Sequence, residues 1–262
     1  FAKAWFKLTH RDMGPKSSYV GPEIPEEDYS WQDPIPTVNH ELVNAKNIDL
    51  IKTEIKNSEL TNEDMITTAW ASASTYRISD RRGGANGARI RLEPQINWES
   101  NNPENLKRII KVYESIQEKF NKNSQTQKIS LADLIVLAGC VAIEDAAFLG
   151  GKTINMPFLP GRMDALEENT DIEGMSVLEP IADGFRNYKK ANYTLSSEEL
   201  LIDKAQQLTL TAPEMTALIG GIRVLNSNYN QSSIGVLTKT PGVLNNDYFR
   251  NLCSMDYEWK PK

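Results

Sequence analysis

Histidine and cysteine are scarce in this chain of 262 residues, which has two of each. Two cysteines, Cys140 and Cys253, are too few for a disulfide framework or a zinc site, and we expect two buried thiols. The histidines, His10 and His40, are far apart in sequence. Neither has a cysteine or carboxylate at metal-ligand spacing, although Asp12 is close to His10. We therefore predict no metal ion in this chain.

The sequence also lacks long apolar runs and an excess of basic residues. No run approaches the roughly 20 apolar residues that cross a bilayer, so no membrane-spanning segment is predicted. A formal net charge of -6 argues against a general nucleic-acid binder, because neutralising phosphates requires a basic face. The hydrophobic fraction of 40% and charged fraction of 24% are ordinary for a soluble globular protein, and the length allows a substantial core.

Helical periodicity dominates what is present, and strand patterns are weak throughout. Apolar residues recur at helical spacing, and Ser or Thr followed three residues later by Asp or Glu marks several helix starts. The sequence therefore predicts a mainly α fold. The predicted helices cover residues 1–9, 48–55, 65–73, 103–120, 131–149, 196–208 and 211–225.

Two segments have no sustained helical period. Residues 15–36 are rich in proline and contain Tyr19, Tyr29 and Trp31, which predicts an extended connector that packs on a surface and contains a domain boundary. Residues 156–188 are too long for an ordinary loop in a compact domain. We expect this second segment to be functional or to be a specific packing device.

The glycine-rich loop RRGGANGAR, residues 81–89, has two interpretations. Glycine amides and the arginines Arg81, Arg82 and Arg89 could bind a phosphate or another anion. However, the loop lacks the GK[ST] ending of a P-loop, and it follows a helix where a dinucleotide fingerprint requires a strand. The preferred interpretation is a tight loop whose glycines adopt positive φ and whose arginines bridge carboxylates.

Other reactive groups have ordinary structural explanations. Ser72 and Ser74 have no histidine nearby and lie on a predicted core helix, and Cys140 lies on the apolar side of its helix. HRDMGP, residues 10–15, concentrates ionisable groups at a helix end. Arg11 keeps its proton, so it can act only as a fixed charge whose location changes, or as a cap on the helix dipole. The residues alone favour the cap.

Several long strings carry a resemblance to one family. FAKAWFKLTHRDMGPKS, WASASTYRISDRRGGANGARIRLEPQINW, LADLIVLAGCVAIE, PGRMDA, EPIADGFRNY, LLIDKAQQLTLTAPEMTALIGG and NDYFRNL resemble the C-terminal portion of the bifunctional catalase-peroxidases. The resemblance covers essentially the whole chain. It implies two peroxidase-like halves in the parent protein, an N-terminal half that binds haem b and a C-terminal copy that does not.

This resemblance divides the chain in two. Residues 1–34 would be the last helix of the haem domain plus the interdomain connector, and residues 35–262 would be an incomplete C-terminal copy. The resemblance thus implies a haem-peroxidase-like helical fold that is truncated at its C-terminus. The chain begins without a methionine, and we expect it to be a fragment. A cytoplasmic location is expected, with the periplasm as the alternative.

The peroxidase pattern can be compared position by position. The family's R-x-x-W-H series falls on Thr67, Trp70 and Ala71, so only the tryptophan is present. The asparagine that orients the distal histidine aligns with Ile96, and the proximal histidine aligns with Ile222. Peroxide chemistry needs an imidazole and a cation, and haem iron needs an axial ligand. The resemblance therefore predicts a degenerate site, filled by apolar side chains.

The resemblance also implies a role for this portion. The parent enzyme would disproportionate hydrogen peroxide and oxidise one-electron donors with haem, while this portion would be a structural platform for the haem domain and contribute to a homodimer. Arg11 aligns with the family's mobile arginine, which serves the haem domain. The alternatives are an independently active peroxidase with a remodelled site, or an anion-binding module.

Overall fold

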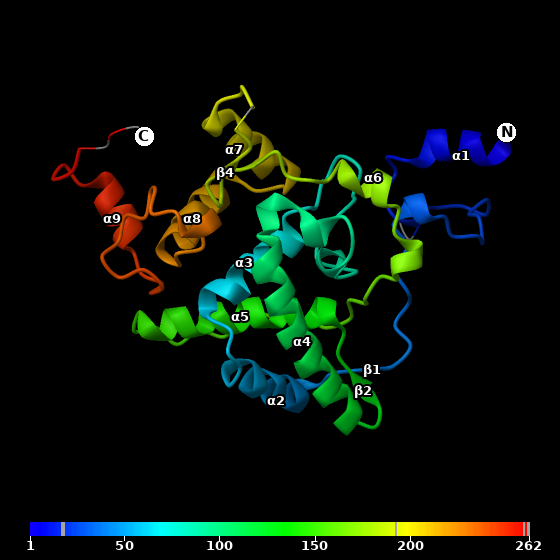
Figure 1. The fold of residues 1–262 in the computed structure, drawn as a ribbon, viewed down its shortest axis with the longest axis horizontal. Helices are drawn as coiled ribbons and strands as arrows, with labels where there is room; N and C mark the ends of the chain where they lie inside the picture. Colours follow the sequence, from blue (N-terminus) through cyan, green and yellow to red (C-terminus); the bar gives the residue numbers. More distant parts are fainter. Residues whose placement is uncertain (17–18, 192, 259, 261–262) are drawn as a thin grey trace.

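The computed structural model describes residues 1–16, 19–191, 193–258 and 260. It is mainly helical, as the sequence predicts (Figure 1). The helices are α1 (Ala2–His10), α2 (Ala45–Lys56), α3 (Asn62–Ala73), α4 (Pro103–Asn123), α5 (Leu131–Leu149), α6 (Ile172–Ser176), α7 (Ser197–Gln207), α8 (Ala212–Val224) and α9 (Asp247–Cys253). The seven predicted helices are confirmed. The short helices α6 and α9 were not predicted.

The strands are very short. β1 (Glu41–Leu42) pairs in parallel with β2 (Gln127–Lys128), and β3 (Ala182–Asp183) pairs antiparallel with β4 (Tyr188–Lys189). No helix in the described part of the chain is long and apolar enough to cross a membrane.

Helix α5 is the centre of the main core. It is apolar around most of its circumference, and α2, α3 and α4 all pack against it (Figure 1). The closest approach is between α3 and α5, where a Cβ placed on Gly139 would lie 2.7 Å from the Cβ of Ala69. The absence of a side chain at Gly139 therefore lets the two helices cross closely. Buried Ile51, Ile109 and Tyr113 complete this core from α2 and α4.

Side-chain caps begin most of the long helices, as the sequence predicts. The Asp64 amide of α3 donates to Thr61 Oγ1 at 3.1 Å, and the Asp133 amide of α5 donates to Ser130 Oγ at 3.0 Å. Helices α7 and α8 begin with capping boxes of the same kind. Each cap satisfies amides that have no partner within the helix.

The segment of residues 156–188 is in part a packing device for α5. The carboxylate of Asp164 accepts hydrogen bonds from the amides of Leu131 and Ala132, at 2.8 and 2.9 Å. In return, Asp133 on α5 accepts from the amide of Gly161 at 2.7 Å and from Arg162 Nη1 at 2.9 Å. These contacts fix the segment to the N-terminal end of α5.

The N-terminal segment forms an aromatic cluster of its own. Phe6 of α1 contacts the connector rings of Tyr19, Tyr29 and Trp31, with centroids 5.6 to 6.3 Å apart. Packing of the connector aromatics is therefore confirmed, and the surface they cover is α1. Helix α1 itself buries no residue, and it lies at the edge of the molecule (Figure 1). The division of the chain after residue 34 stays a prediction.

The two cysteines differ from the expectation in one respect. Cys140 is buried. Burial raises the pKa of its thiol, and the nearby Glu144 carboxylate raises it further. Cys253, however, is exposed, so the expectation of a second buried thiol was wrong. It is the last residue of the seven-residue α9, which buries no side chain.

The close crossing of α3 and α5 predicts that a glycine substitution at the crossing destabilises the fold, whereas one in an open position of another helix stabilises it. Gly139→Ala should destabilise the fold by about 1–3 kcal/mol, because the added methyl group overlaps Ala69 in a packed core. Gly221→Ala in α8 is the matched control, since nothing lies within 4 Å of the added Cβ. It should stabilise the fold by about 0.5–1 kcal/mol. Urea unfolding measures both, and a shift of the same sign in both variants would contradict this account.

Candidate functional site

Apolar side chains fill the space between α3 and α8. Phe185, which follows β3, is fully buried, and Ile222 of α8 is only 4% exposed. Trp70 of α3 packs edge-on against Phe185, with ring centroids 5.2 Å apart, and belongs to the same cluster as Ile222. Ile222 is therefore buried, as expected, among carbon atoms. No ligand for a metal ion reaches this space from its position.

A buried ion pair lies beside this apolar cluster. Asp183 Oδ2 accepts hydrogen bonds from Trp70 Nε1 and from Arg186 Nε, both at 2.8 Å. Arg186 Nη1 donates to the carbonyl of Ser100 at 2.9 Å, and its Nη2 has no partner. Trp70 is the one member of the R-x-x-W-H series that is present in this chain. Its indole N–H holds the Asp183 carboxylate in place.

Arg223 fastens the segment after β3 to α8. It donates to the Gly184 carbonyl at 2.8 Å, to Asn187 Oδ1 at 2.7 Å and to Asn228 Oδ1 at 2.8 Å. Burial lowers the pKa of this guanidinium, and its many acceptors compensate for the lost water. Sequence reasoning missed Asp183, Arg186 and Arg223. The only indication of Asp183 and Arg186 was the aperiodic string EPIADGFRNY, and that of Arg223 was its place in a predicted helix; neither reveals which charges become buried.

Thr67 and Ala71 face a separate, polar cavity of about 600 Å³. Thr67 Oγ1 donates to the Glu63 carbonyl at 2.7 Å, within α3 itself. The cavity is also lined by residues 100–102 and 228–231, and neither histidine of the chain reaches it. The prediction that apolar side chains fill the site therefore holds around Ile222. It is wrong around Thr67, where the space is open and polar.

Ile96 does not belong to this cavity. It is half-buried and packs against the main core, near α4, and it is absent from the lining that includes Thr67 and Ala71. Of the asparagines that line the cavity, Asn101 is the nearest to Ile96 in sequence, and its Nδ2 donates to the Gln95 carbonyl at 2.9 Å; the others are Asn102, Asn105, Asn228 and Asn230. The structure thus brings Thr67 and Ala71 together and places Ile96 elsewhere, because residues 95–101 form two short turns that change direction.

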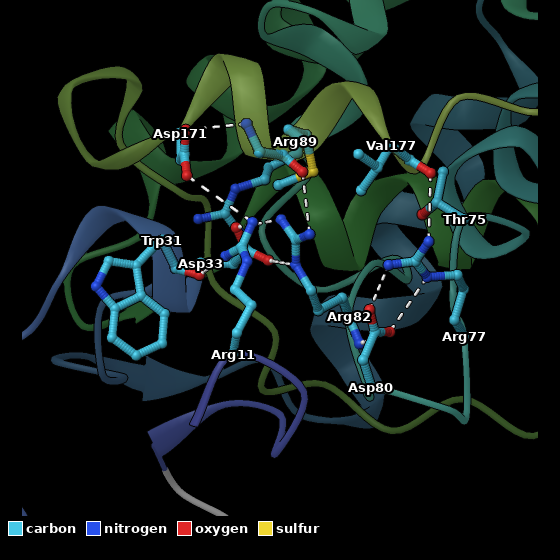
Figure 2. A network of polar contacts seen from close by, with 12 residues as sticks. Arg11, Trp31, Asp33, Thr75, Arg77, Asp80, Arg82, Arg89, Asp171 and Val177 are labelled. Carbon is cyan, nitrogen blue, oxygen red and sulfur yellow. Dashed lines mark hydrogen bonds and ion pairs between the residues drawn. The ribbon is translucent and has the colours of Figure 1, made fainter. Parts of the chain in front are cut away.

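The side chain of Arg11 points into a cluster of charges (Figure 2). Its Nη1 donates to the carbonyl of Trp31, and its Nη2 lies 3.9 Å from Asp171 Oδ2. Arg11 is the C-cap residue of α1, with its backbone amide bonded to the Lys7 carbonyl, while its guanidinium is directed to the connector. Burial, and then the charge of Arg82, lower the pKa of Arg11. A guanidinium nevertheless stays protonated in proteins.

The glycine-rich loop supplies the other arginines of this cluster. Arg82 binds Asp33 through Nε at 2.6 Å and Nη2 at 3.2 Å, so the predicted carboxylate contact is confirmed for this arginine of the loop alone. Gly83, Gly84 and Gly87 have φ values of 77°, 91° and 97°, which confirms the positive φ expected for this loop. The cluster joins residues on both sides of the predicted domain boundary.

Comparison with known proteins agrees with this architecture. The family model described as Peroxidase matches residues 2–257. The chain belongs to the peroxidase family.

Within that family, the similar proteins share one description. The chain is 59% identical over 263 residues to a catalase-peroxidase of Clostridium botulinum (strain Eklund 17B / Type B), and 60% identical over 261 residues to one of Shewanella baltica (strain OS155 / ATCC BAA-1091). A catalase-peroxidase of Methanosarcina acetivorans is 59% identical over 261 residues. These matches cover 99–100% of this chain but only 36% of each relative. The chain therefore corresponds to a portion of a catalase-peroxidase.

The buried pair beside Trp70 predicts a large stability effect. Asp183→Ala should lower the free energy of unfolding by about 3–5 kcal/mol, because it leaves the Arg186 charge buried without its carboxylate. Asp203→Ala on the exposed face of α7 is the control and should change stability by about 0.5 kcal/mol or less. Urea unfolding followed by circular dichroism compares the two. Equal losses in both variants would show that the buried pair has no special role.

Proposed function

We propose that this chain is the haem-free, C-terminal part of a catalase-peroxidase and acts as a structural platform for the haem domain. The whole parent enzyme would disproportionate hydrogen peroxide and oxidise one-electron donors. Its haem b would be bound by the N-terminal domain, in the part of the relatives that this chain does not cover. The platform would pack against that domain and contribute to a homodimer. We expect the parent enzyme in the cytoplasm.

The burial of Ile222 is the observation that supports this proposal most directly. Haem iron needs an axial ligand such as an imidazole or a thiolate. Ile222 offers only carbon atoms, and it is packed against Phe185 and Trp70. The residues present at this position therefore do not fit a haem. A hydrophobic side chain fully buried in this way contributes about 1.5–3 kcal/mol to folding, so the replacement favours the fold.

The polar cavity beside Thr67 does not favour the alternative of an independent peroxidase. Cleavage of a peroxide bond uses a base that moves a proton and a cation that polarises the bond. Arg186 and Arg108 line this cavity, but both are paired with carboxylates. No imidazole lines the cavity, because His10 and His40 lie elsewhere.

Arg11 is the residue to which we assign a role in the parent enzyme, that of the mobile arginine. Its contact with Asp171 is long, at 3.9 Å, and its side chain remains 29% exposed. Arg82 lies close enough to repel it. Apart from the Trp31 carbonyl, Arg11 has no short bond to the described residues, whereas Arg82 is held by two bonds to the Asp33 carboxylate; Arg11 is therefore the more easily displaced of the two charges.

Haemin tests the absence of a site in this chain. We expect no stoichiometric, shifted Soret band and no peroxide turnover when haemin is added to the purified protein, because no axial ligand is available at Ile222. Absorbance titration and oxygen release are the measurements. A band that saturates at one haem per chain, together with turnover, would overturn the platform proposal in favour of an independent peroxidase.

Reconstitution tests the platform role and separates it from that of Arg11. Mixing this chain with a haem domain that lacks these residues should restore peroxide disproportionation. The Arg11→Ala variant should restore the haem spectrum as well as the unchanged chain does. Its peroxide turnover should be about one tenth of that of the unchanged chain, or lower, because the moving charge is lost. Arg250→Ala on α9, another exposed arginine, is the matched control and should behave as the unchanged chain. No change in the haem spectrum with two folded partners would contradict the platform role.

A further inference from the structure

A second cavity, of about 720 Å³, lies between the N-terminal segment and the glycine-rich loop. Its lining is strongly basic. The charged residues on it are Arg11, Lys16, Arg81, Arg82 and Arg89, against Asp28 and Asp33. Arg11, Arg82 and Arg89 converge on this region in Figure 2. The cavity therefore has a surplus of positive charge, although the chain as a whole is acidic.

The ion pairs around the cavity leave two guanidinium groups without a carboxylate. Lys16 pairs with Asp28 at 2.9 Å, and Arg82 pairs with Asp33 at 2.6 Å. Arg11 has only its long contact with Asp171. Among the described residues, no carboxylate lies within 4.0 Å of Arg81 or Arg89. The surplus positive charge of the cavity is therefore carried by Arg81 at its exposed rim and by the buried Arg89.

Arg89 is the unusual member of this group, because it is buried. It is only 6% exposed; its Nη2 donates to the Pro34 carbonyl at 2.9 Å, and its buried Nε has no partner at all. Buried charges in proteins are normally paired, since removing a charge from water costs several kcal/mol. Burial lowers the pKa of Arg89, which reflects this cost.

The surrounding backbone accommodates the Arg89 guanidinium beside the cavity. Arg89 begins a short turn that contains the buried Ile90 and follows Ala88, whose φ is 44°. A Cβ on Gly87 would lie only 3.1 Å from Arg89 Nη1, so the glycine makes room for the guanidinium. The loop is therefore built to hold a buried positive charge beside the cavity.

We propose that this cavity binds a small oxyanion of the phosphate type, held by Arg89 inside, Arg81 at the rim and Arg11 from the N-terminal segment. The paired N–H donors of an arginine guanidinium match the geometry of two phosphate oxygens. The glycine amides take a smaller part, because the amide of Gly84 is already bound to Thr75 Oγ1 at 2.9 Å. Side chains therefore define this site, unlike the backbone cradle of a nucleotide-binding loop.

The proposal does not depend on the platform function, because neither haem nor peroxide takes part. The cavity volume leaves room for more than a free phosphate ion. Both inorganic phosphate and a phosphate monoester share the required chemistry, and the test distinguishes them.

Isothermal titration of this chain with inorganic phosphate, in a buffer without oxyanions and at ionic strength held constant with chloride, tests the site. We expect saturable binding at one site per chain. Arg89→Gln should weaken binding by at least about tenfold, the loss that corresponds to one charge-assisted hydrogen bond. Arg81→Gln, at an exposed position that does not endanger folding, should weaken it several-fold. The matched control Arg250→Gln removes an equally exposed charge far along the chain and should leave the affinity unchanged.

Three outcomes decide the matter. Absence of saturable binding to the unchanged chain would overturn the proposal, as would an affinity that neither Arg81→Gln nor Arg89→Gln alters. An equal loss in Arg250→Gln would indicate attraction to general surface charge and would also overturn it. A parallel titration with glycerol phosphate identifies the source: tighter binding than inorganic phosphate assigns the site to a phosphate ester, and weaker binding assigns it to the free ion. If Arg89→Gln does not fold, Arg81→Gln alone decides between these outcomes.

Discussion

The close crossing of α3 on α5 is the contact on which the rest of this structure depends. Gly139 and Ala69 allow the two backbones to approach, and α2 and α4 then pack against the remaining sides of α5. From this crossing α3 presents Trp70 to the cluster that includes α8, and Thr67 to a polar cavity. One helix thus takes part in the core, in the apolar space beside α8 and in the cavity, and its position sets the geometry of all three.

The two sides of α3 meet different surroundings. On the α8 side, Ile222 and Phe185 belong to one buried apolar cluster, which favours folding through apolar burial. Around Thr67, polar residues surround open space, and the two arginines there, the exposed Arg108 and the buried Arg186, are paired with Asp64 and Asp183. A peroxidase-family fold therefore does not by itself fix which side chains occupy these two spaces, because fold and site chemistry are separable.

The sequence predicted what depends on local pattern and missed what depends on distant contacts. Periodicity and capping residues located the long helices, but α6 and α9 are too short to show a period. The resemblance located Thr67, Trp70 and Ala71 one turn apart on α3. Ile96 lies in a stretch of short turns, where a shift of a few residues changes which side chain meets the cavity, and Ser100, Asn101 and Asn102 meet it instead. The burial of Asp183 and Arg186 arises only when residues from three distant segments come together.

The cap that Asp164 places on α5 has a consequence for how the chain folds. The first amides of this helix find their acceptor more than 30 residues downstream, across the whole length of α5 and the turn that follows it. Until that later segment arrives, the N-terminal end of the central helix has unsatisfied donors and frays readily. The contact is therefore a non-local one that closes a loop, and closing loops of this kind slows folding. Formation of the central helix and docking of residues 161–164 should accordingly occur as one cooperative event.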